Sequence, residues 1–175
     1  MMALHKRILL IGCGGSGKST FARKLGKATG LPVVHLDQLY WKPGWTPLSR
    51  EEFDERLAAE LQKPEWIMDG NFDRTIPRRL EFCDAVIFLD LPRLVCLFGV
   101  IKRVLLSYGR TRPDIGEGCP EKFDLSFFRW VWTFNDQKRE KYLALLNGSD
   151  KPFYRIRSRR ELPSLIQKIA DSKEE

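Results

Sequence analysis

The stretch GCGGSGKS at residues 12–19 restricts what this chain can fold into more than any other part of the sequence. It follows the apolar run RILLI at 7–11 and precedes the helix-compatible run FARKLGKA at 21–28. Its glycines permit backbone conformations closed to other residues, so consecutive N–H groups can turn inward around an anion at the positive end of the next helix. The pattern predicts a strand, a phosphate-binding loop and a helix in an α/β fold.

Two phosphate-binding patterns overlap in this stretch. Gly12 to Gly17 fits the dinucleotide fingerprint G-x-G-x-x-G, and Asp37 lies where a ribose-binding acid is expected. The same glycines continue into Lys18 and Ser19, which complete G-x-x-x-x-G-K-[ST]. A dinucleotide site has no use for that pair, whereas in a phosphate loop the lysine reaches the β- and γ-phosphates and the serine hydroxyl ligates Mg²⁺. The predicted nucleotide-binding residues are Gly12, Gly14, Gly15, Ser16, Gly17, Lys18, Ser19 and Thr20.

Apolar runs and helix-like stretches alternate along the 175 residues, which is the length of one domain, 1–175. Ser49 and Glu52 have the spacing of a capping box at the start of one helix. Short strands that are apolar on both faces and separated by helices predict an α/β fold of three layers, with a mostly parallel five-stranded sheet between helices. The expected strands are 7–11, 33–36, 65–68, 85–89 and 153–157, and the expected helices are 18–29, 50–63 and 92–108.

Two segments depart from this alternation. Residues 37–49 form a loop rich in aromatic residues, Pro and Gly, within an acceptor-side insert at about 37–63, and residues 109–122 form a second loop of Gly, Pro and charged residues. Long irregular loops in compact domains are commonly functional lids. We expect both on the ligand side of the sheet, with 109–122 as a short lid.

Composition and charge restrict the expected location and the kind of binding partner. No apolar run is long enough to span a membrane, and the first residues lack an apolar leader, so we expect a cytoplasmic protein. The four cysteines have no spacing typical of zinc sites or disulfide frameworks. Residues 93–160 hold 15 Lys and Arg against 7 Asp and Glu, within a net charge of +7. This surplus favours an anionic partner, either nucleotide phosphates or a nucleic-acid backbone, although no nucleic-acid-reading motif is present.

Three further stretches carry a family resemblance. The phosphate loop on the first strand, the short chain and the two loops resemble the nucleoside-monophosphate-kinase-like group of P-loop kinases, which is related to adenylate kinases. Within it, HLDQLYWKPGW (35–45), WIMDGNFDRT (66–75) and RTRPDIGEGCPEKFD (110–124) resemble the bacterial DNA topology modulation proteins. The resemblance covers nearly the whole chain and implies a P-loop NTPase fold that uses ATP and Mg²⁺.

The resemblance also implies roles for residues after the second and third strands. Asp37 would orient or deprotonate the phosphoryl acceptor, with a turn cap as the alternative. The segment from Asp69 to Arg74 resembles the D-G-F-P-R segment of adenylate kinases, with one extra residue before the arginine. Asp69 would hold Mg²⁺ through water, and Asn71 and Arg74 would bind the acceptor.

The predicted lid and the first loop supply the remaining candidates. Arg110 and Arg112, with Arg103 just before them, are expected to neutralise the transferring phosphoryl group, and an exposed basic loop is the alternative. Tyr40 and Trp41, together with Trp45, either stack on the acceptor or cap the core. The stripe Trp130, Val131, Trp132 and Phe134 is expected to be helix core, and Asp90 to be structural or to line the cleft.

The leading hypothesis is ATP- and Mg²⁺-dependent phosphoryl transfer to a small-molecule acceptor: a nucleoside, a nucleotide or another metabolite. Lys18, Asp37, Arg110 and Arg112 are the predicted catalytic residues. The alternative is a nucleic-acid-binding regulator switched by ATP, in keeping with the family label. The sequence does not define the acceptor, the preference for ATP over GTP, or the oligomeric state.

Overall fold

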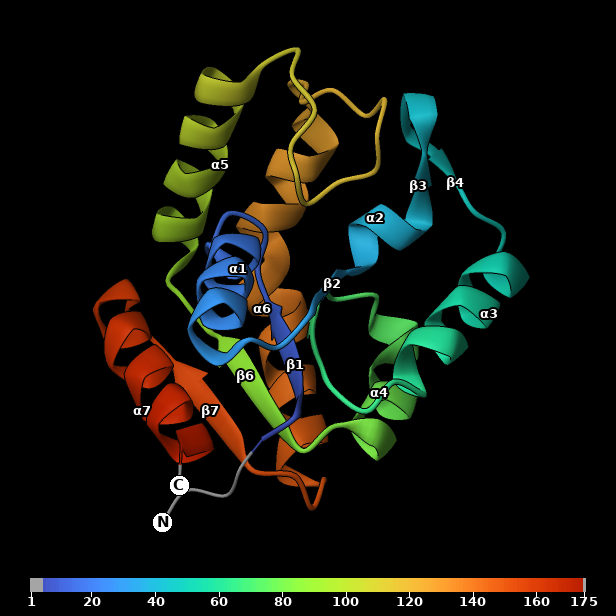
Figure 1. Ribbon diagram of the computed structural model, residues 1–175. Helices are drawn as coiled ribbons and strands as arrows, with labels where there is room; N and C mark the ends of the chain where they lie inside the picture. Colours follow the sequence, from blue (N-terminus) through green and yellow to red (C-terminus); the bar gives the residue numbers. More distant parts are fainter. Residues whose placement is uncertain (1–4, 175) are drawn as a thin grey trace.

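A parallel sheet forms the centre of the computed structural model, which describes residues 5–174 (Figure 1). The strand order is β2-β5-β1-β6-β7, and each neighbouring pair is parallel. The predicted five-stranded sheet is therefore confirmed, and β1, which carries the phosphate loop, lies in its middle. The strands are β1 (Arg7–Gly12), β2 (Val33–His35), β5 (Trp66–Asp69), β6 (Ala85–Leu89) and β7 (Phe153–Ile156).

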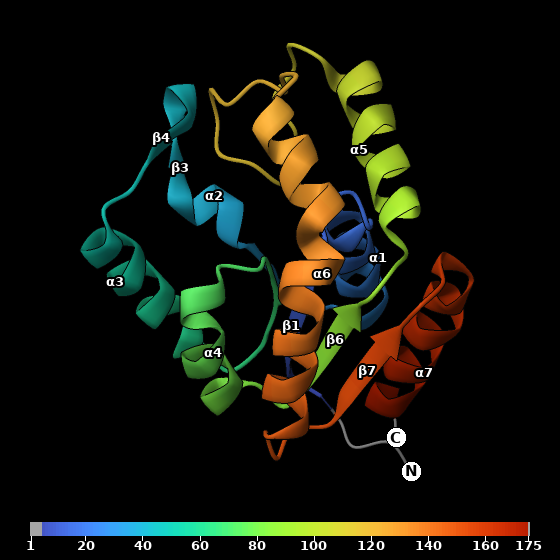
Figure 2. The same ribbon diagram turned by 180° about the vertical axis from the view of Figure 1, so that it is seen from behind.

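Alternation along β1 explains the two helical layers. Ile8 and Leu10 point to one face and pack with α1 (Lys18–Thr29) and α7 (Leu162–Glu174). Leu9 and Ile11 point to the other face, where four helices cover the sheet. Because successive side chains of a strand face opposite sides, one fully apolar strand supports both layers. Figures 1 and 2 show the layers from opposite sides. The helices of the second layer are α3 (Arg50–Leu61), α4 (Ile76–Phe82), α5 (Arg93–Ser107) and α6 (Leu125–Asn147).

The helix boundaries follow the expected local signals. α1 ends at Gly30, which adopts a left-handed conformation (φ 72°) and donates its N–H to the Gly26 carbonyl. α3 begins with the predicted capping box, in which the Ser49 hydroxyl accepts from the Glu52 N–H and the Glu52 carboxylate accepts from the Ser49 N–H. These signals confirm the predicted end of α1 and the predicted start of α3.

The segment 37–49 is more regular than the loop predicted from its sequence. It contains the short helix α2 (Leu36–Tyr40) and a small hairpin of β3 (Trp41–Lys42) and β4 (Thr46–Pro47), joined through a tight turn. Gly44 permits that turn because it has a φ of 74°. The buried Leu36 begins α2 instead of ending β2, so Asp37 lies in the first turn of a helix.

The segment 109–122 is irregular, as predicted, and lies against the hairpin. The Gly44 N–H donates to the Gly118 carbonyl at 2.8 Å, and the Trp45 indole N–H donates to the Pro120 carbonyl at 3.0 Å. Trp45 thus holds the segment 109–122 against the hairpin, a contact that the sequence did not indicate.

The predicted core stripe of α6 is wrong at one position. Val131 and Phe134 are buried, but Trp132 is 46% exposed. The Arg93 guanidinium of α5 lies over the Trp132 ring, 5.2 Å from the ring centroid.

In the described part of the chain, no helix is both long and apolar enough to cross a membrane.

Candidate active site

The phosphate loop is already folded around its own backbone carbonyls. The Ser16 hydroxyl donates to the Cys13 carbonyl at 2.7 Å, and Lys18 Nζ donates to the same oxygen at 2.8 Å. Gly15 has a φ of 74°, and a Cβ there would lie 2.1 Å from the carbonyl oxygen of Cys96 in α5. Only glycine fits at that position, which explains one glycine of the motif in steric terms. Cys13 is buried, consistent with a packing role.

Two side chains from outside the motif brace this loop. Asn71 Oδ1 accepts from the Gly12 N–H at 3.0 Å, and Arg159 Nη2 donates to the Gly15 carbonyl at 2.7 Å. Asn71 was predicted to bind the acceptor, and here it supports the loop while also lining the cavity. Sequence reasoning missed Arg159. The one available signal was its place just after β7, at the sheet edge that also carries the loop.

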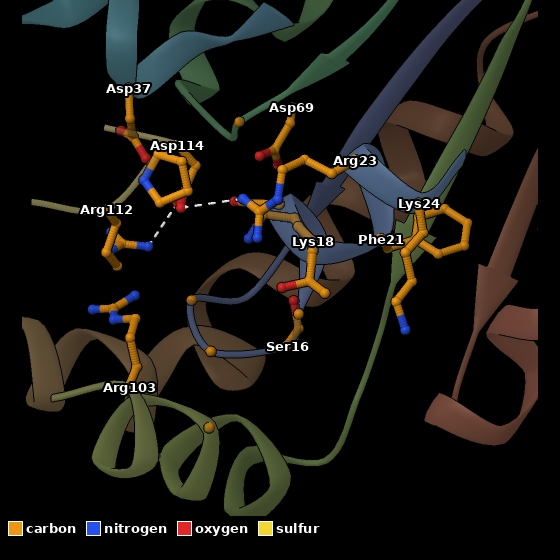
Figure 3. Close-up of a pocket in the computed structure, with 18 of the residues that line it drawn as sticks. Ser16, Lys18, Phe21, Arg23, Lys24, Asp37, Asp69, Arg103, Arg112 and Asp114 are labelled. Atoms are coloured by element: carbon orange, nitrogen blue, oxygen red, sulfur yellow. Dashed lines mark hydrogen bonds and ion pairs between the residues drawn. The ribbon is translucent and has the colours of Figure 1, made fainter. Parts of the chain in front are cut away.

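A cavity of about 920 Å³ opens over the carboxyl ends of the strands. Figure 3 shows Asp37, Arg103 and Arg112 on one side of Lys18, and Phe21 and Lys24 on the other. The structure therefore gathers residues from widely separated parts of the sequence, as expected at the carboxyl ends of a parallel sheet. The predicted site residues that line the cavity are Gly14, Gly15, Ser16, Gly17, Lys18, Ser19, Thr20, Asp37, Asp69, Asn71 and Arg112.

Asp69 and His35 form a buried pair at the ends of adjacent strands. They are register partners in β5 and β2, and His35 Nδ1 lies 2.8 Å from Asp69 Oδ2. Burial alone would raise the pKa of Asp69, but the hydrogen bond with His35 and the charge of Lys18 outweigh it, so this pKa lies below its ordinary value. Asp69 stays ionised, and the sequence analysis did not anticipate the contribution of His35.

The second oxygen of Asp69 is an orphan. Asp69 Oδ1 is buried and has no hydrogen-bond partner among the described residues. A buried carboxylate oxygen without a partner is costly, and a metal-bound water at the phosphate loop would satisfy it. The described residues contain no cluster of three metal-ligating side chains. The donor set therefore fits Mg²⁺ held through water, with nucleotide phosphates and Ser19 as the other ligands.

Asp37 faces the cavity from the first turn of α2. Its carboxylate is half-buried and makes no hydrogen bond within the described part of the chain. Burial, followed by the charge of Asp69, raises the pKa of Asp37 to about 6, although Lys18 and Arg112 act in the opposite direction. Asp37 can therefore exchange a proton near neutral pH.

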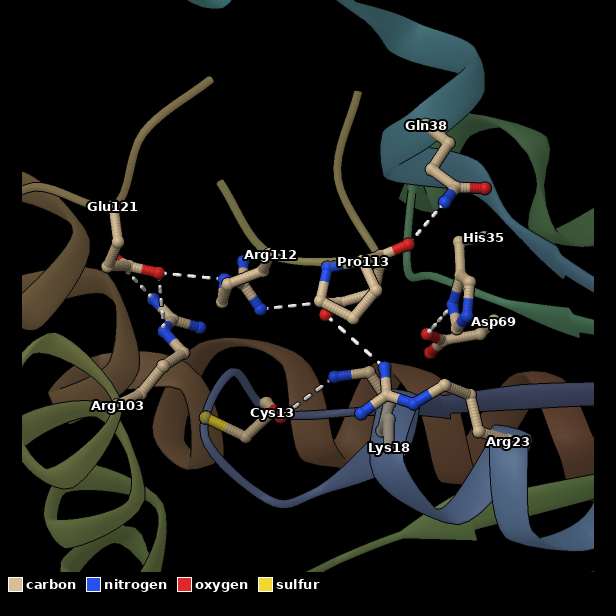
Figure 4. A network of polar contacts seen from close by, with 11 residues as sticks. Cys13, Lys18, Arg23, His35, Gln38, Asp69, Arg103, Arg112, Pro113 and Glu121 are labelled. Atoms are coloured by element: carbon tan, nitrogen blue, oxygen red, sulfur yellow. Dashed lines mark hydrogen bonds and ion pairs between the residues drawn. The ribbon is translucent and has the colours of Figure 1, made fainter. Parts of the chain in front are cut away.

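Arg103 of α5 and Arg112 of the segment 109–122 are paired with carboxylates. Glu121 is buried, and its Oε2 forms ion pairs with Arg112 Nε at 2.8 Å and with Arg103 Nε at 3.1 Å, while its Oε1 accepts a hydrogen bond from Arg103 Nη2 at 3.3 Å (Figure 4). Asp114 binds Arg112 Nη1 at 2.6 Å and Arg23 Nη1 of α1 at 3.4 Å. These ion pairs fix the lid close to the phosphate loop. Sequence reasoning named Arg103 and Arg112 and missed both carboxylates.

Five predicted site residues are not among those that line this cavity: Gly12 at the start of the phosphate loop, and four residues whose side chains lie elsewhere. Arg110 is exposed on the lid, and Arg74 is exposed and binds Asp54 at 2.7 Å. Tyr40 packs edge-on against Trp41 at a ring separation of 4.8 Å. None of these four side chains is among the cavity-lining residues of the described structure.

Asp90 was expected either to be structural or to line the cleft, and its contacts are structural. It is 3% exposed and binds Arg139 Nε at 2.8 Å and Arg155 Nη2 at 2.6 Å. It does not line the cavity in the described structure. Asp90 ties α6 to β7, and it also accounts for the position of Arg139.

The central phosphate loop and the sheet order define an α/β fold of the P-loop class. Comparison with solved structures places it further, in the fold of the P-loop kinases. The chain superposes on deoxyadenosine kinase from M. mycoides with bound dATP at a TM-score of 0.59 and 16% identity, over 96% of this chain and 99% of that one. Shikimate kinase from Bacteroides thetaiotaomicron gives 0.56 and 17%, over 98% and 99%.

A sugar kinase from Janibacter sp. gives a TM-score of 0.51 and 18% identity, over 97% of this chain and 94% of that one. No family model and no curated protein matches the sequence. At these identities the comparisons show the fold, and the chemistry has to be argued from the site itself.

Proposed function

We propose that the protein is an ATP- and Mg²⁺-dependent kinase that phosphorylates a small-molecule acceptor. One observation carries the proposal: the cavity has Lys18 and Ser19 of the phosphate loop beside the ionised Asp69, with the unpaired carboxylate of Asp37 facing the same space. A nucleotide switch needs the phosphate loop alone. A carboxylate of raised pKa across the cavity adds what an attacking hydroxyl requires.

The residues divide the work of phosphoryl transfer. The loop N–H groups at 14–19 bind the β- and γ-phosphates at the N-terminus of α1, and Lys18 exchanges its contact with Cys13 for the phosphates. Arg112 lies across the cavity and stabilises charge on the transferring group. Asp37 orients the acceptor and takes its proton.

Asp69 and Ser19 would hold Mg²⁺, as the orphan oxygen of Asp69 indicates. When bound, the ion neutralises charge on the β- and γ-phosphates. His35 holds the other oxygen of Asp69 in place. Arg110 remains a proposed contact of the transferring phosphoryl group and would require movement of the lid, and Arg74 remains a proposed acceptor contact that would require movement of the segment at 70–75.

The names of the fold relatives agree with this proposal, because they are kinases of deoxyadenosine, shikimate and a sugar. The narrower resemblance to nucleoside-monophosphate kinases and topology modulation proteins remains a prediction. ADP release from Mg-ATP by the purified protein, across a panel of small-molecule acceptors, tests the proposal. Strong stimulation by one compound and its loss in Lys18→Ala would support a kinase. Equal turnover in Lys18→Ala would contradict it.

A further inference from the structure

The cations around the cavity fall into two groups. Lys18, Lys24, Lys102 and Arg159 line it without an ion pair to any described carboxylate. Arg23, Arg103 and Arg112 line it too, and each is bound to Asp114 or Glu121. The unpaired cations include Lys18 of the loop and Arg159, which braces it, so uncompensated positive charge is present where the phosphates of ATP would bind.

The opposite end of the cavity is electrically balanced. Asp37, Arg103, Arg112 and Asp114 lie together on one side of Lys18 (Figure 3). The two carboxylates among these lining residues, Asp37 and Asp114, equal the two arginines in number, and Glu121, which does not line the cavity, is paired with both arginines. An acceptor that carries a dianionic phosphate would meet no net positive charge there, and it would face Asp37 at close range.

The arginine that could supply positive charge for an acceptor phosphate, Arg74, does not line the cavity. Arg74, the sequence-based candidate for an acceptor phosphate, makes a two-point ion pair with Asp54, with nitrogen to oxygen distances of 2.7 and 2.9 Å. Both side chains are exposed, and neither lines the cavity. The acceptor end thus lacks a free guanidinium among the described residues.

Aromatic rings complete the acceptor end. Phe72, Phe127 and Trp130 line the cavity, and the last two are stacked on each other with ring centroids 5.5 Å apart. Phe127 and Trp130 also pack over Gly14, where a Cβ would lie 2.7 Å from the Phe127 ring. The Arg103 guanidinium lies over the Phe127 ring, 5.0 Å from its centroid, so Phe72 and Trp130 supply the apolar surface, which suits a flat or cyclic ligand.

We propose that the acceptor is an uncharged ring compound with a free hydroxyl group, such as a nucleoside or a cyclic alcohol, and that the site discriminates against its phosphorylated form. This rests on the proposed kinase function and narrows it. The acceptor oxygen attacks the γ-phosphorus of ATP, and the bond from that phosphorus to the β–γ bridging oxygen breaks. The hydroxyl proton passes to Asp37, ADP leaves with the bonding electron pair, and the product is a phosphate monoester.

Matched pairs of acceptors test this. Mg-ATP binding to the wild-type protein is measured first by calorimetry. ADP formation is then followed with adenosine and AMP, cytidine and CMP, thymidine and TMP, and glucose and glucose 6-phosphate. The expected result is kcat/KM at least about 100-fold higher for the neutral member of one pair than for its phosphorylated partner.

Variants separate the parts of the inference. Asp37→Asn is expected to lower kcat by about 100-fold or more while the Kd of Mg-ATP stays within about twofold. Asp171→Asn, on the exposed face of α7, is the matched control and should behave as wild type. Asp114→Asn leaves the arginines less neutralised, so inhibition by the phosphorylated partner should strengthen about tenfold.

The other outcomes contradict either the neutral-acceptor inference or the proposed kinase function. Preferred turnover of a phosphorylated member overturns the neutral-acceptor inference and leaves the kinase proposal standing. Normal Mg-ATP binding with no turnover of any neutral compound also overturns the inference. Absence of Mg-ATP binding refutes the proposed function itself.

Discussion

Replacing Asp37 by Asn should stabilise the folded protein at neutral pH while it removes activity. The pKa of Asp37 is raised from its ordinary value of 3.8 to about 6, a difference of roughly 2 pKa units. At about 1.4 kcal/mol per unit, the ionised side chain costs the folded state at most about 3 kcal/mol. The carboxylate is half-buried, and water reduces this amount further. A site that holds a destabilised carboxylate trades stability for chemistry.

The sign follows from proton linkage. The folded state binds this proton more tightly than the unfolded state, so Asp37 lowers stability as pH rises from about 4 to about 6, and the full cost is present above pH 7. Urea unfolding of wild type and Asp37→Asn at pH 7.5 and pH 4.5 measures this loss of stability. The variant should be more stable by about 1–3 kcal/mol at pH 7.5, with a much smaller gap at pH 4.5. A variant that is no more stable at pH 7.5, or a gap that does not change with pH, would refute the reasoning.

Two further substitutions test the architecture of the site. His35→Phe removes the hydrogen bond to Asp69, so the free energy of unfolding should fall by about 1–3 kcal/mol and half-saturation of turnover should need more Mg²⁺; His5→Phe, at the other histidine, should leave the Mg²⁺ dependence unchanged. Gly15→Ala places a Cβ 2.1 Å from a backbone carbonyl of α5 and should abolish Mg-ATP binding, measured by calorimetry. Gly17→Ala meets no atom within 4 Å, so it carries only the backbone strain of a φ of 99° and should retain more binding; equal losses would show that the clash is not the cause.

The sheet and the phosphate loop were predictable because their signals are local. The run at 8–11 is apolar at every position, the loop motif specifies its own conformation, and the Ser49 capping box marks a helix start. The hairpin at 41–47 was missed because its strands are two residues each, shorter than any periodic pattern can reveal. Trp132 was misplaced because a run of aromatic residues hides which face of a helix is covered.

The candidate site was predictable where a residue follows a strand, belongs to the motif or, like Arg112, lies in the predicted lid. Asp69 ends β5 and lines the cavity as expected. Glu121 is positioned by its ion pair with Arg112, and Arg159 by its hydrogen bond to the Gly15 carbonyl. The partners are 9 or more residues apart in the chain, and no local sequence pattern predicts such contacts. Arg74 is a residue that the motif resemblance placed in the site and the fold places outside it, where it pairs with Asp54.

Phosphorus NMR of the protein with Mg-ATP and the neutral acceptor panel tests the central claim most directly, because it shows where the γ-phosphate goes. The account predicts a new phosphate monoester resonance with one acceptor, in step with ADP, and no such signal with Lys18→Ala. Release of the γ-phosphate only as inorganic phosphate, at the same rate with every acceptor and with none, would contradict a kinase.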